Sequence, residues 1–190
     1  MLTTDRGLEG RQEARQGIIG AVELGESALA EARERVPLPV AVKRISIFGL
    51  GYVGAVSLAC LARDGHLVTG VDIDDTKLNL IRSRKSPILE EGIQELMRDV
   101  VDSGRVVVTN DALQAVRDTE LSFVCVGTPS AANGSQDLTA ILRLAEQIGA
   151  ALAAKREFHT IVIRSTVQPG TVEEKIEPIL ERASGKQSGV

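Results

Sequence analysis

Short apolar runs recur along the chain from about residue 44 onward and alternate with longer amphipathic segments. The runs are rich in Val and Ile, which favours β-strands, and strands are expected at about 45–48, 67–71, 105–109, 121–126 and 160–163. Helices are predicted between and after them at about 52–64, 75–84, 90–101, 111–117, 138–154 and 171–183. Asp75 is the expected N-cap of the second helix.

The alternation of strands and helices indicates βαβ crossovers, in which consecutive strands lie parallel. The run at 121–126, Leu-Ser-Phe-Val-Cys-Val, is almost continuously apolar, as expected of a parallel strand that is buried on both faces. The predicted fold class is therefore α/β, with a doubly wound parallel sheet.

Residues 1–42 have a different character. Residues 8–35 are rich in Glu, Arg, Ala and Gln and predict a weak helix that several glycines interrupt. We therefore expect a weakly helical or disordered leader at 1–42 and one domain at 43–190. The abrupt change of pattern suggests the hypothesis that the native protein starts at Val42, with an upstream reading frame fused to it. Mass spectrometry of the native N-terminus tests this hypothesis.

Three glycines, Gly49, Gly51 and Gly54, form a G-x-G-x-x-G pattern directly after the first predicted strand and at the start of a helix. In such a turn the first glycine allows the tight bend, the second leaves room for a diphosphate, and the third lets the helix approach the sheet. Backbone N–H groups at the helix start, including those of Tyr52 and Val53, would hold the phosphate charge. The pattern predicts a Rossmann dinucleotide-binding turn; a glycine-rich turn that binds nothing is the alternative.

Asp72 follows the second predicted strand, 18 residues after Gly54. An acid at this point of the fingerprint accepts hydrogen bonds from the adenosine ribose and repels a 2′-phosphate, so NAD is expected rather than NADP. Because Asp74 and Asp75 lie close by, a simple turn aspartate is the alternative. Lys77 lies one turn into the next helix and could reach the same ribose, although a lone lysine is more often a solvated surface residue.

Two further strands end in small hydroxyl residues, in the segments Val-Gly-Thr-Pro (126–129) and Arg-Ser-Thr-Val (164–167). Ligands of open α/β sheets bind beyond the carboxyl ends of the strands, where Gly127 would allow a ring or ribose to approach. Thr128 and Thr166 could donate and accept hydrogen bonds there. By themselves, both are equally well explained as turn or cap residues.

Composition narrows the class of protein. The formal net charge is −4 and aromatic residues make up 2% of the chain, which argues against a nucleic-acid partner. No run of about 18 apolar residues occurs, so no membrane span is expected. The acids near the N-terminus argue against a secretory signal.

The cysteines and histidines carry no expected chemistry. Cys60 and Cys125 lie in apolar segments and are interpreted as buried small side chains, which favours a cytoplasmic location. His66 and His159 have no second ligand at metal-binding spacing, so no metal site is expected. Both histidines are interpreted as residues that lead into strands.

Five ordered motifs together resemble the UDP-glucose/GDP-mannose dehydrogenase family, and the resemblance covers essentially all of residues 44–190. Its motifs are RISIFGLGYVGAV (44–56), GHLVTGVDID (65–74), KSPILEEGI (85–93), FVCVGTPS (123–130) and RSTVQPGTV (164–172). Within the family they look most similar to members that oxidise GDP-mannose, with members that oxidise UDP-glucose next. The KSP, GTP and STV-PGT motifs argue against hydroxyacyl or phosphogluconate dehydrogenases, which share the fold.

The resemblance implies NAD as cofactor and assigns it a set of contacts: Tyr52, Val53, Asp72, Lys77, Thr128 and Thr166. It also implies that the segment at 85–92 approaches the active site, with Pro87, Glu90 and Glu91 as weaker candidates. The implied reaction is a two-step, NAD-dependent oxidation of the C6 alcohol of a nucleotide sugar to a carboxylate, with GDP-mannose to GDP-mannuronate favoured. Oxidation of UDP-glucose, or a stand-alone NAD-binding module without turnover, are the alternatives.

The departures from the family matter equally. The family's catalytic cysteine, which holds the aldehyde-level intermediate, belongs to a region beyond this sequence, and neither Cys60 nor Cys125 matches it. No catalytic residue is therefore expected in this chain, and the chain alone is expected to be inactive. The substrate-binding half, the long helix that builds the family's homo-oligomer, and the last strand of the sheet are also expected to lie beyond residue 190.

Overall fold

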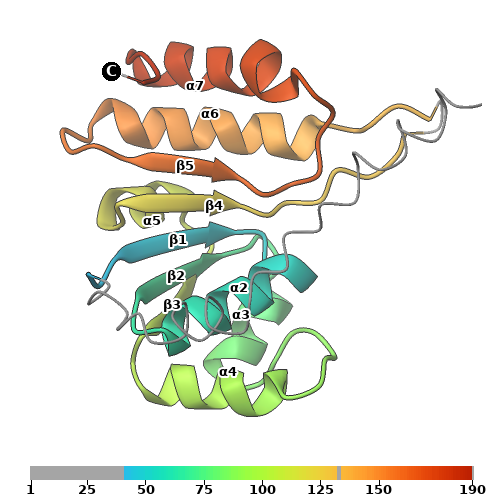
Figure 1. Ribbon diagram of the computed structural model, residues 1–190, viewed down its shortest axis with the longest axis vertical. Helices are drawn as coiled ribbons and strands as arrows, with labels where there is room; N and C mark the ends of the chain where they lie inside the picture. The colour runs from blue at the N-terminus through green and yellow to red at the C-terminus, as the bar shows by residue number, and fades with distance from the viewer. Residues whose placement is uncertain (1–40, 132–133, 190) are drawn as a thin grey trace, which may run out of the picture. The chain divides into compact units, whose positions relative to one another are not determined.

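Five parallel strands form the sheet of the computed structural model, which describes residues 41–131 and 134–189. The strands are β1 (Arg44–Phe48), β2 (Leu67–Val71), β3 (Val106–Thr109), β4 (Leu121–Val124) and β5 (Thr160–Ile163). Their order across the sheet is β3-β2-β1-β4-β5 (Figure 1). The chain thus builds outward from β1 to β3 and then returns to place β4 on the other side of β1. The expected doubly wound α/β fold is confirmed.

Helices cover both faces of this sheet (Figure 1). They are α2 (Tyr52–Arg63), α3 (Asp75–Arg82), α4 (Ile93–Asp102), α5 (Ala112–Asp118), α6 (Thr139–Ala153), the π-helical turn η3 (Val172–Ile176) and α7 (Glu177–Ser184). The helices α2, α3 and α4 pack on one face, and α5, α6, η3 and α7 pack on the other. This arrangement follows from right-handed crossovers that reverse direction at β1.

The alternation of side chains along β1 shows how one strand serves two cores. Ile45 and Ile47 are buried against α2 and α4, whereas Phe48 is buried against α5 and α6. Successive residues of a strand point to opposite faces, so a central strand needs apolar residues at nearly every position. The sheet therefore divides the largely aliphatic core into two clusters.

The second predicted helix is capped by a different residue from the one expected. Asp74 is the N-cap of α3, because its side chain accepts a hydrogen bond from the amide of Thr76 at 2.8 Å. Asp75 is the first residue inside the helix. The prediction of Asp75 was wrong because neighbouring aspartates give the same composition signal, and only the extended backbone of Asp74 suits a cap.

Three predicted boundaries also shift. β4 ends at Val124 rather than at residue 126, since the chain beyond it leaves the ladder. The helix expected at 90–101 begins at Ile93, because Gly92 before it takes a left-handed conformation with φ of 73°. The last helix starts with the π-helical turn η3, which the sequence pattern did not indicate.

One prediction concerns a part of the chain that the structure does not describe. The interpretation of residues 1–42 as a weakly helical or disordered leader falls outside the described residues, except for residues 41 and 42. Both histidines directly precede strands, as predicted, with His66 before β2 and His159 before β5. No helix in the described part of the chain is both long enough and apolar enough to span a membrane.

A groove of about 900 Å³ runs along the outer side of β5. Its apolar lining includes Ile161 and Ile163 of β5 and Val172, Ile176 and Leu180 of the segment that follows. In the described sheet β5 pairs with β4 on one side and forms the edge on the other. The expectation that a further strand extends this edge stays a prediction.

Candidate dinucleotide-binding site

The glycine turn between β1 and α2 has the geometry that its sequence predicts. Gly49 adopts φ of +92°, a left-handed conformation that favours glycine, and its amide donates to Val71 O at 2.8 Å. A Cβ on Gly54 would lie 1.9 Å from Gly49 O, so this position cannot carry a side chain without moving the backbone. A Cβ on Gly51 would meet no atom within 4 Å. Gly51 therefore faces open space, whereas Gly54 is held against the turn.

The start of α2 presents backbone donors to that open space. The first intrahelical bond runs from Ala55 N to Gly51 O at 2.9 Å, so the amides of residues 52–54 have no partner within the helix. No side chain of the described residues caps this helix. Tyr52 and Val53 are 55% and 44% exposed, which leaves this end of the helix accessible. Such an end is suited to an anion because its N–H groups and the helix dipole act together.

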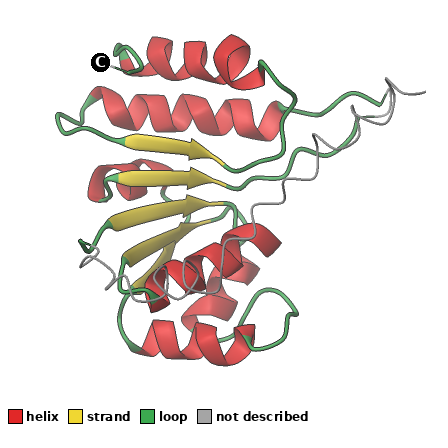
Figure 2. Cartoon of the chain, in the orientation of Figure 1, coloured by secondary structure: helices red, strands yellow, loops and turns green. Residues whose placement is uncertain are grey.

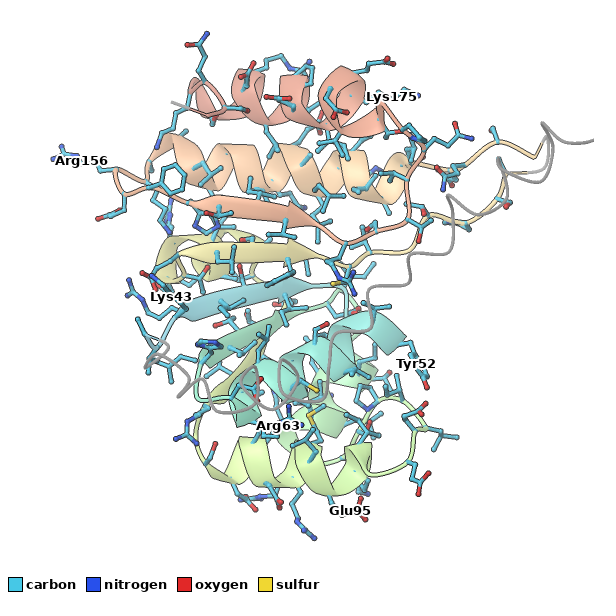
Figure 3. All side chains as sticks on the ribbon, in the orientation of Figure 1. Lys43, Tyr52, Arg63, Glu95, Arg156 and Lys175 are labelled. Atoms are coloured by element: carbon cyan, nitrogen blue, oxygen red, sulfur yellow. The ribbon has the colours of Figure 1, made fainter. Side chains whose placement is uncertain are left out.

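The sheet edge at which these groups gather is the carboxyl edge. Figure 3 shows Tyr52 at this end of the molecule, whereas Lys43 and Arg156 lie at the opposite end. In Figure 2 the loops that leave the arrowheads of the strands gather on the side of the glycine turn. Ligands of open α/β sheets bind at this edge, near the point where the strand order reverses.

Asp72 directly follows β2 and is bound to the glycine turn. Its Oδ2 accepts from the amide of Leu50 at 2.7 Å, and its Oδ1 accepts from the amide of Asp74 at 2.9 Å. The residue is only 7% exposed. A carboxylate has about four acceptor sites, so two backbone donors leave room for others. The acid and the turn predicted separately from the sequence form one hydrogen-bonded unit.

Lys77 lies on the first turn of α3 and reaches the same carboxylate. Its Nζ is 3.1 Å from Asp72 Oδ2, and its side chain is 33% exposed. The structure thus brings together Asp72 and Lys77, as the sequence led us to expect. The lysine offers further N–H donors beside the carboxylate, which suits a ligand that carries vicinal hydroxyl groups.

Thr128 and Thr166, on the loops that follow β4 and β5, are also brought together. Thr128 Oγ1 donates to Thr166 O at 2.7 Å. Ser165 adds a second cross-connection, because its Oγ donates to Val126 O at 2.7 Å. Gln136 adds a third, with its Nε2 donating to Thr166 O at 2.8 Å. Ser165 and Gln136 were not predicted as members of the site, since no local motif marks contacts between residues 39 and 30 positions apart.

Gln94 joins the start of the segment at 85–92 to α4. Gln94 Nε2 donates to Arg84 O at 2.9 Å, and Gln94 Oε1 accepts from the amide of Ser86 at 3.1 Å. Pro87 is half-buried, whereas Glu90 and Glu91 are exposed. No hydrogen bond joins these three residues to the glycine turn in the described part of the chain. Their assignment to an active site stays a prediction.

The two cysteines are free and half-buried. Cys125 lies against the glycine turn, since its backbone would be 3.0 Å from a Cβ on Gly49. Burial raises the pKa of the Cys125 thiol, and Arg164 opposes this only in part. A thiol with a raised pKa is poorly suited to act as a nucleophile. Among residues 41–131 and 134–189, no group of three or more His, Cys, Asp or Glu side chains could hold a metal ion.

A buried polar cluster lies at the opposite ends of the strands, where β4 and β5 begin. Lys155 is 8% exposed, and its Nζ donates to the carbonyls of Val116 and Thr119, the latter closely. It also lies 3.0 Å from His159 Nδ1, and His159 Nε2 lies 2.8 Å from Ser122 Oγ. Burial and the neighbouring Lys155 lower the pKa of His159 to about 4. The cluster satisfies buried polar groups at the amino ends of β4 and β5, away from the glycine turn.

These observations fit a bound dinucleotide. The amides at the start of α2 would hold a diphosphate, and Gly51 leaves space for it. Asp72 and Lys77 would hold the ribose of the adenosine half. Because β4 lies on the opposite side of β1 from β2, the other half of the dinucleotide would extend over the loops that carry Thr128 and Thr166.

Comparisons with known proteins agree with this geometry. Residues 43–190 match the NAD-binding domain of the UDP-glucose/GDP-mannose dehydrogenase family. GDP-mannose 6-dehydrogenase from Pseudomonas syringae pv. syringae is 52% identical over 147 residues, which are 77% of this chain and 34% of that relative. UDP-glucose 6-dehydrogenase from Pseudomonas aeruginosa is 38% identical over 137 residues, which are 72% of this chain and 29% of that relative.

Solved structures give the same result. A ternary complex of GDP-mannose dehydrogenase from Pseudomonas aeruginosa superposes with a TM-score of 0.76 at 51% identity, over 77% of this chain and 34% of that chain. A UDP-glucose dehydrogenase from Pyrobaculum islandicum gives 0.75 at 34% identity, over 80% of this chain and 35% of that chain. The chain thus spans about a third of the length of these relatives.

Proposed function

The chain belongs to the UDP-glucose/GDP-mannose dehydrogenase family, with residues 43–190 as its NAD-binding domain, and from this premise we propose that it is the cofactor-binding part of a GDP-mannose 6-dehydrogenase. GDP-mannose is favoured over UDP-glucose because the GDP-mannose 6-dehydrogenase of P. syringae is 52% identical, whereas the UDP-glucose 6-dehydrogenase of P. aeruginosa is 38% identical. Oxidation of UDP-glucose is the second candidate. The reaction would convert the C6 alcohol of the sugar to a carboxylate with two NAD.

One observation carries the proposed NAD site. The carboxylate of Asp72 is bound to the amide of Leu50 at 2.7 Å, inside the glycine turn. This bond supports a site in which the ribose-binding acid and the diphosphate-binding amides are fixed relative to each other. A carboxylate at this place also disfavours the 2′-phosphate of NADP.

We assign the cofactor contacts as follows. The diphosphate would lie against Gly49, Gly51 and Gly54 and the amides of Tyr52 and Val53. The adenosine ribose would bind Asp72 and Lys77. The ion pair between these two residues, which both lie beyond β2, supports this assignment. The nicotinamide half would lie beside Thr128 and Thr166, beyond β4 and β5. Bound there, NAD would accept a hydride from the substrate, and the residues of this chain would bind and orient it.

The chemistry of the sugar needs groups that we place outside this chain. In the family scheme a thiolate holds the aldehyde-level intermediate between the two oxidation steps. Cys60 lies within α2, and the pKa of the Cys125 thiol is raised by burial, so neither supports that role. We therefore propose that the chain alone binds NAD without turnover, and that the nucleotide sugar and a homo-oligomer require a further part of the enzyme. A stand-alone NAD-binding module is the alternative.

The two free thiols favour a cytoplasmic location, because disulfides are rare in that compartment.

A binding assay and a turnover assay together test this proposal. Calorimetric titration of the chain with NAD should show binding, and NADP should bind more weakly. NADH should not form when GDP-mannose or UDP-glucose is added to the chain alone. When the complementary part of a GDP-mannose 6-dehydrogenase is added, NADH formation with GDP-mannose in excess of UDP-glucose would support the assignment, and a preference for UDP-glucose would reverse it.

A further inference from the structure

The loops beyond β4 and β5 are joined by side chains rather than by backbone pairing. The ladder between the two strands ends at Val124 and Ile163. The amides of Arg164 and Ser165 then both donate to Val124 O, at 2.8 and 3.0 Å, so regular parallel pairing stops there. Beyond this point the two segments would separate unless other groups held them.

Gln136 supplies the connection farthest from the sheet. Its Nε2 donates to Thr166 O at 2.8 Å, and its Oε1 accepts from the amide of Gln168 at 3.2 Å. A carbonyl and an amide two residues apart are the pair of groups that a neighbouring parallel strand would bind. The side-chain amide of Gln136 therefore takes the place of a strand and fixes the backbone of residues 166–168.

Gln136 is itself anchored by its neighbours. It forms an isolated antiparallel bridge with Ser130, and the amide of Asp137 donates to Pro129 O at 2.8 Å. The carboxylate of Asp137 accepts from the amide of Thr139 at 2.9 Å, at the start of α6. The glutamine thus extends from a segment that is tied both to the loop after β4 and to a long helix.

The shared carbonyl of Thr166 has a consequence for Thr128. Thr166 O accepts from both Thr128 Oγ1 and Gln136 Nε2, which occupies both of its lone pairs. Since the hydroxyl proton of Thr128 is used in this bond, Thr128 Oγ1 faces a ligand as an acceptor only. It would then select a donor, such as a ribose hydroxyl group or a carboxamide N–H.

We infer that Gln136 is a positioning residue for the nicotinamide half of NAD: its amide holds Thr166 O in place and thereby sets the orientation of Thr128 and Thr166. This inference rests on the proposed function, and it goes beyond the contacts assigned there. Gln136 does not touch the cofactor; it acts through the two threonines. A merely structural role for Gln136 would affect all ligands of the domain equally.

The test compares NAD with ADP, which contains the adenosine and diphosphate but lacks the nicotinamide riboside. Gln136→Leu removes both hydrogen bonds at similar side-chain volume. We expect its affinity for NAD to fall about 5-fold while its affinity for ADP stays within about 2-fold of the unaltered chain. The matched control is Gln114→Leu, which removes a similar exposed amide contact, to Asp118 on α5, and should change neither affinity.

Each outcome decides the question. If the unaltered chain binds neither NAD nor ADP, the proposed function fails. If it binds both, and Gln136→Leu leaves NAD binding unchanged or weakens NAD and ADP equally, the positioning role is overturned. Should Gln136→Leu fail to fold, the isosteric Gln136→Glu replaces it, because that variant keeps the acceptor for Gln168 and loses the donor to Thr166. The same comparison of NAD with ADP then applies.

Discussion

The amide of Leu50 donates to Asp72 Oδ2 at 2.7 Å, although the two residues are 22 positions apart. This bond joins the turn after β1 to the end of β2, so it fixes the proposed diphosphate-binding and ribose-binding elements relative to each other. Asp72 is 7% exposed and has Lys77 as a charged partner, which keeps its carboxylate in a fixed orientation. The proposed site is therefore prearranged, which would lower the cost of ordering groups when a dinucleotide binds.

Replacing Asp72 by asparagine should weaken NAD binding and reduce the discrimination against NADP. The change removes the charge that pairs with Lys77 and that we propose binds the ribose, and a hydrogen bond to a charged group contributes about 1.5–3 kcal/mol. We expect the NAD affinity to fall about 10- to 100-fold, measured by calorimetry. Asp74→Asn is the matched control, because asparagine also caps helices. Equal losses in the two variants would contradict the assignment of Asp72.

Two glycine substitutions should separate folding from binding. Gly54→Ala places a Cβ 1.9 Å from Gly49 O, so we expect a loss of about 3 kcal/mol or more in the free energy of unfolding. Gly51→Ala places its Cβ in open space, at φ of −76°, and should change stability by only about 0.5 kcal/mol.

The binding measurements should show the reverse pattern. The methyl group of Gly51→Ala would occupy the space that we assign to the diphosphate, and NAD affinity should fall at least about 10-fold. Thermal melting and NAD titration of both variants test this. A Gly51→Ala variant that binds NAD normally would place the diphosphate elsewhere.

The cluster around His159 should make folding sensitive to mild acid. Burial and Lys155 lower the pKa of His159 to about 4 from its ordinary 6.5, so the folded state favours the neutral ring. This contribution to stability is fully present above pH 6.5 and is lost as the pH falls from 6.5 to 4. The ring is half-exposed, so we expect a loss of only about 1–2 kcal/mol in the free energy of unfolding.

Denaturant unfolding between pH 7 and pH 4 measures this effect. A His159→Gln variant cannot titrate in this range and should show a flatter pH profile. The carboxylates with lowered pKa values, such as Glu120 and Asp137, lose their contribution mainly at lower pH. A variant with the same slope as the unaltered chain between pH 6.5 and pH 4 would assign the effect to other groups.

The sequence predicted those parts of the fold and site that local patterns encode. The glycine turn, the acid after β2 and the threonines after β4 and β5 all lie at strand ends that the apolar runs define. The strand order β3-β2-β1-β4-β5 was not predicted, because it depends on how crossovers pack rather than on any one segment.

The residues that local patterns did not mark act through long-range contacts. Gln136 gains its partners only when the loop after β4 folds against the loop after β5. His159 was predicted only to lead into a strand, yet the fold places it between Lys155 and Ser122. The choice of Asp74 over Asp75 as a cap depends on backbone angles, which composition does not distinguish.

The most direct test of the NAD site is a titration of the isotope-labelled chain with NAD, followed through its backbone amide NMR signals. We expect the largest shifts at residues 49–54 and 72–77, with further shifts at 126–128 and 165–168. Signals from the groove beside β5 and from the cluster around His159 should change little. Shifts that fall on the groove instead, with the amides of the glycine turn unchanged, would contradict binding of NAD at that turn.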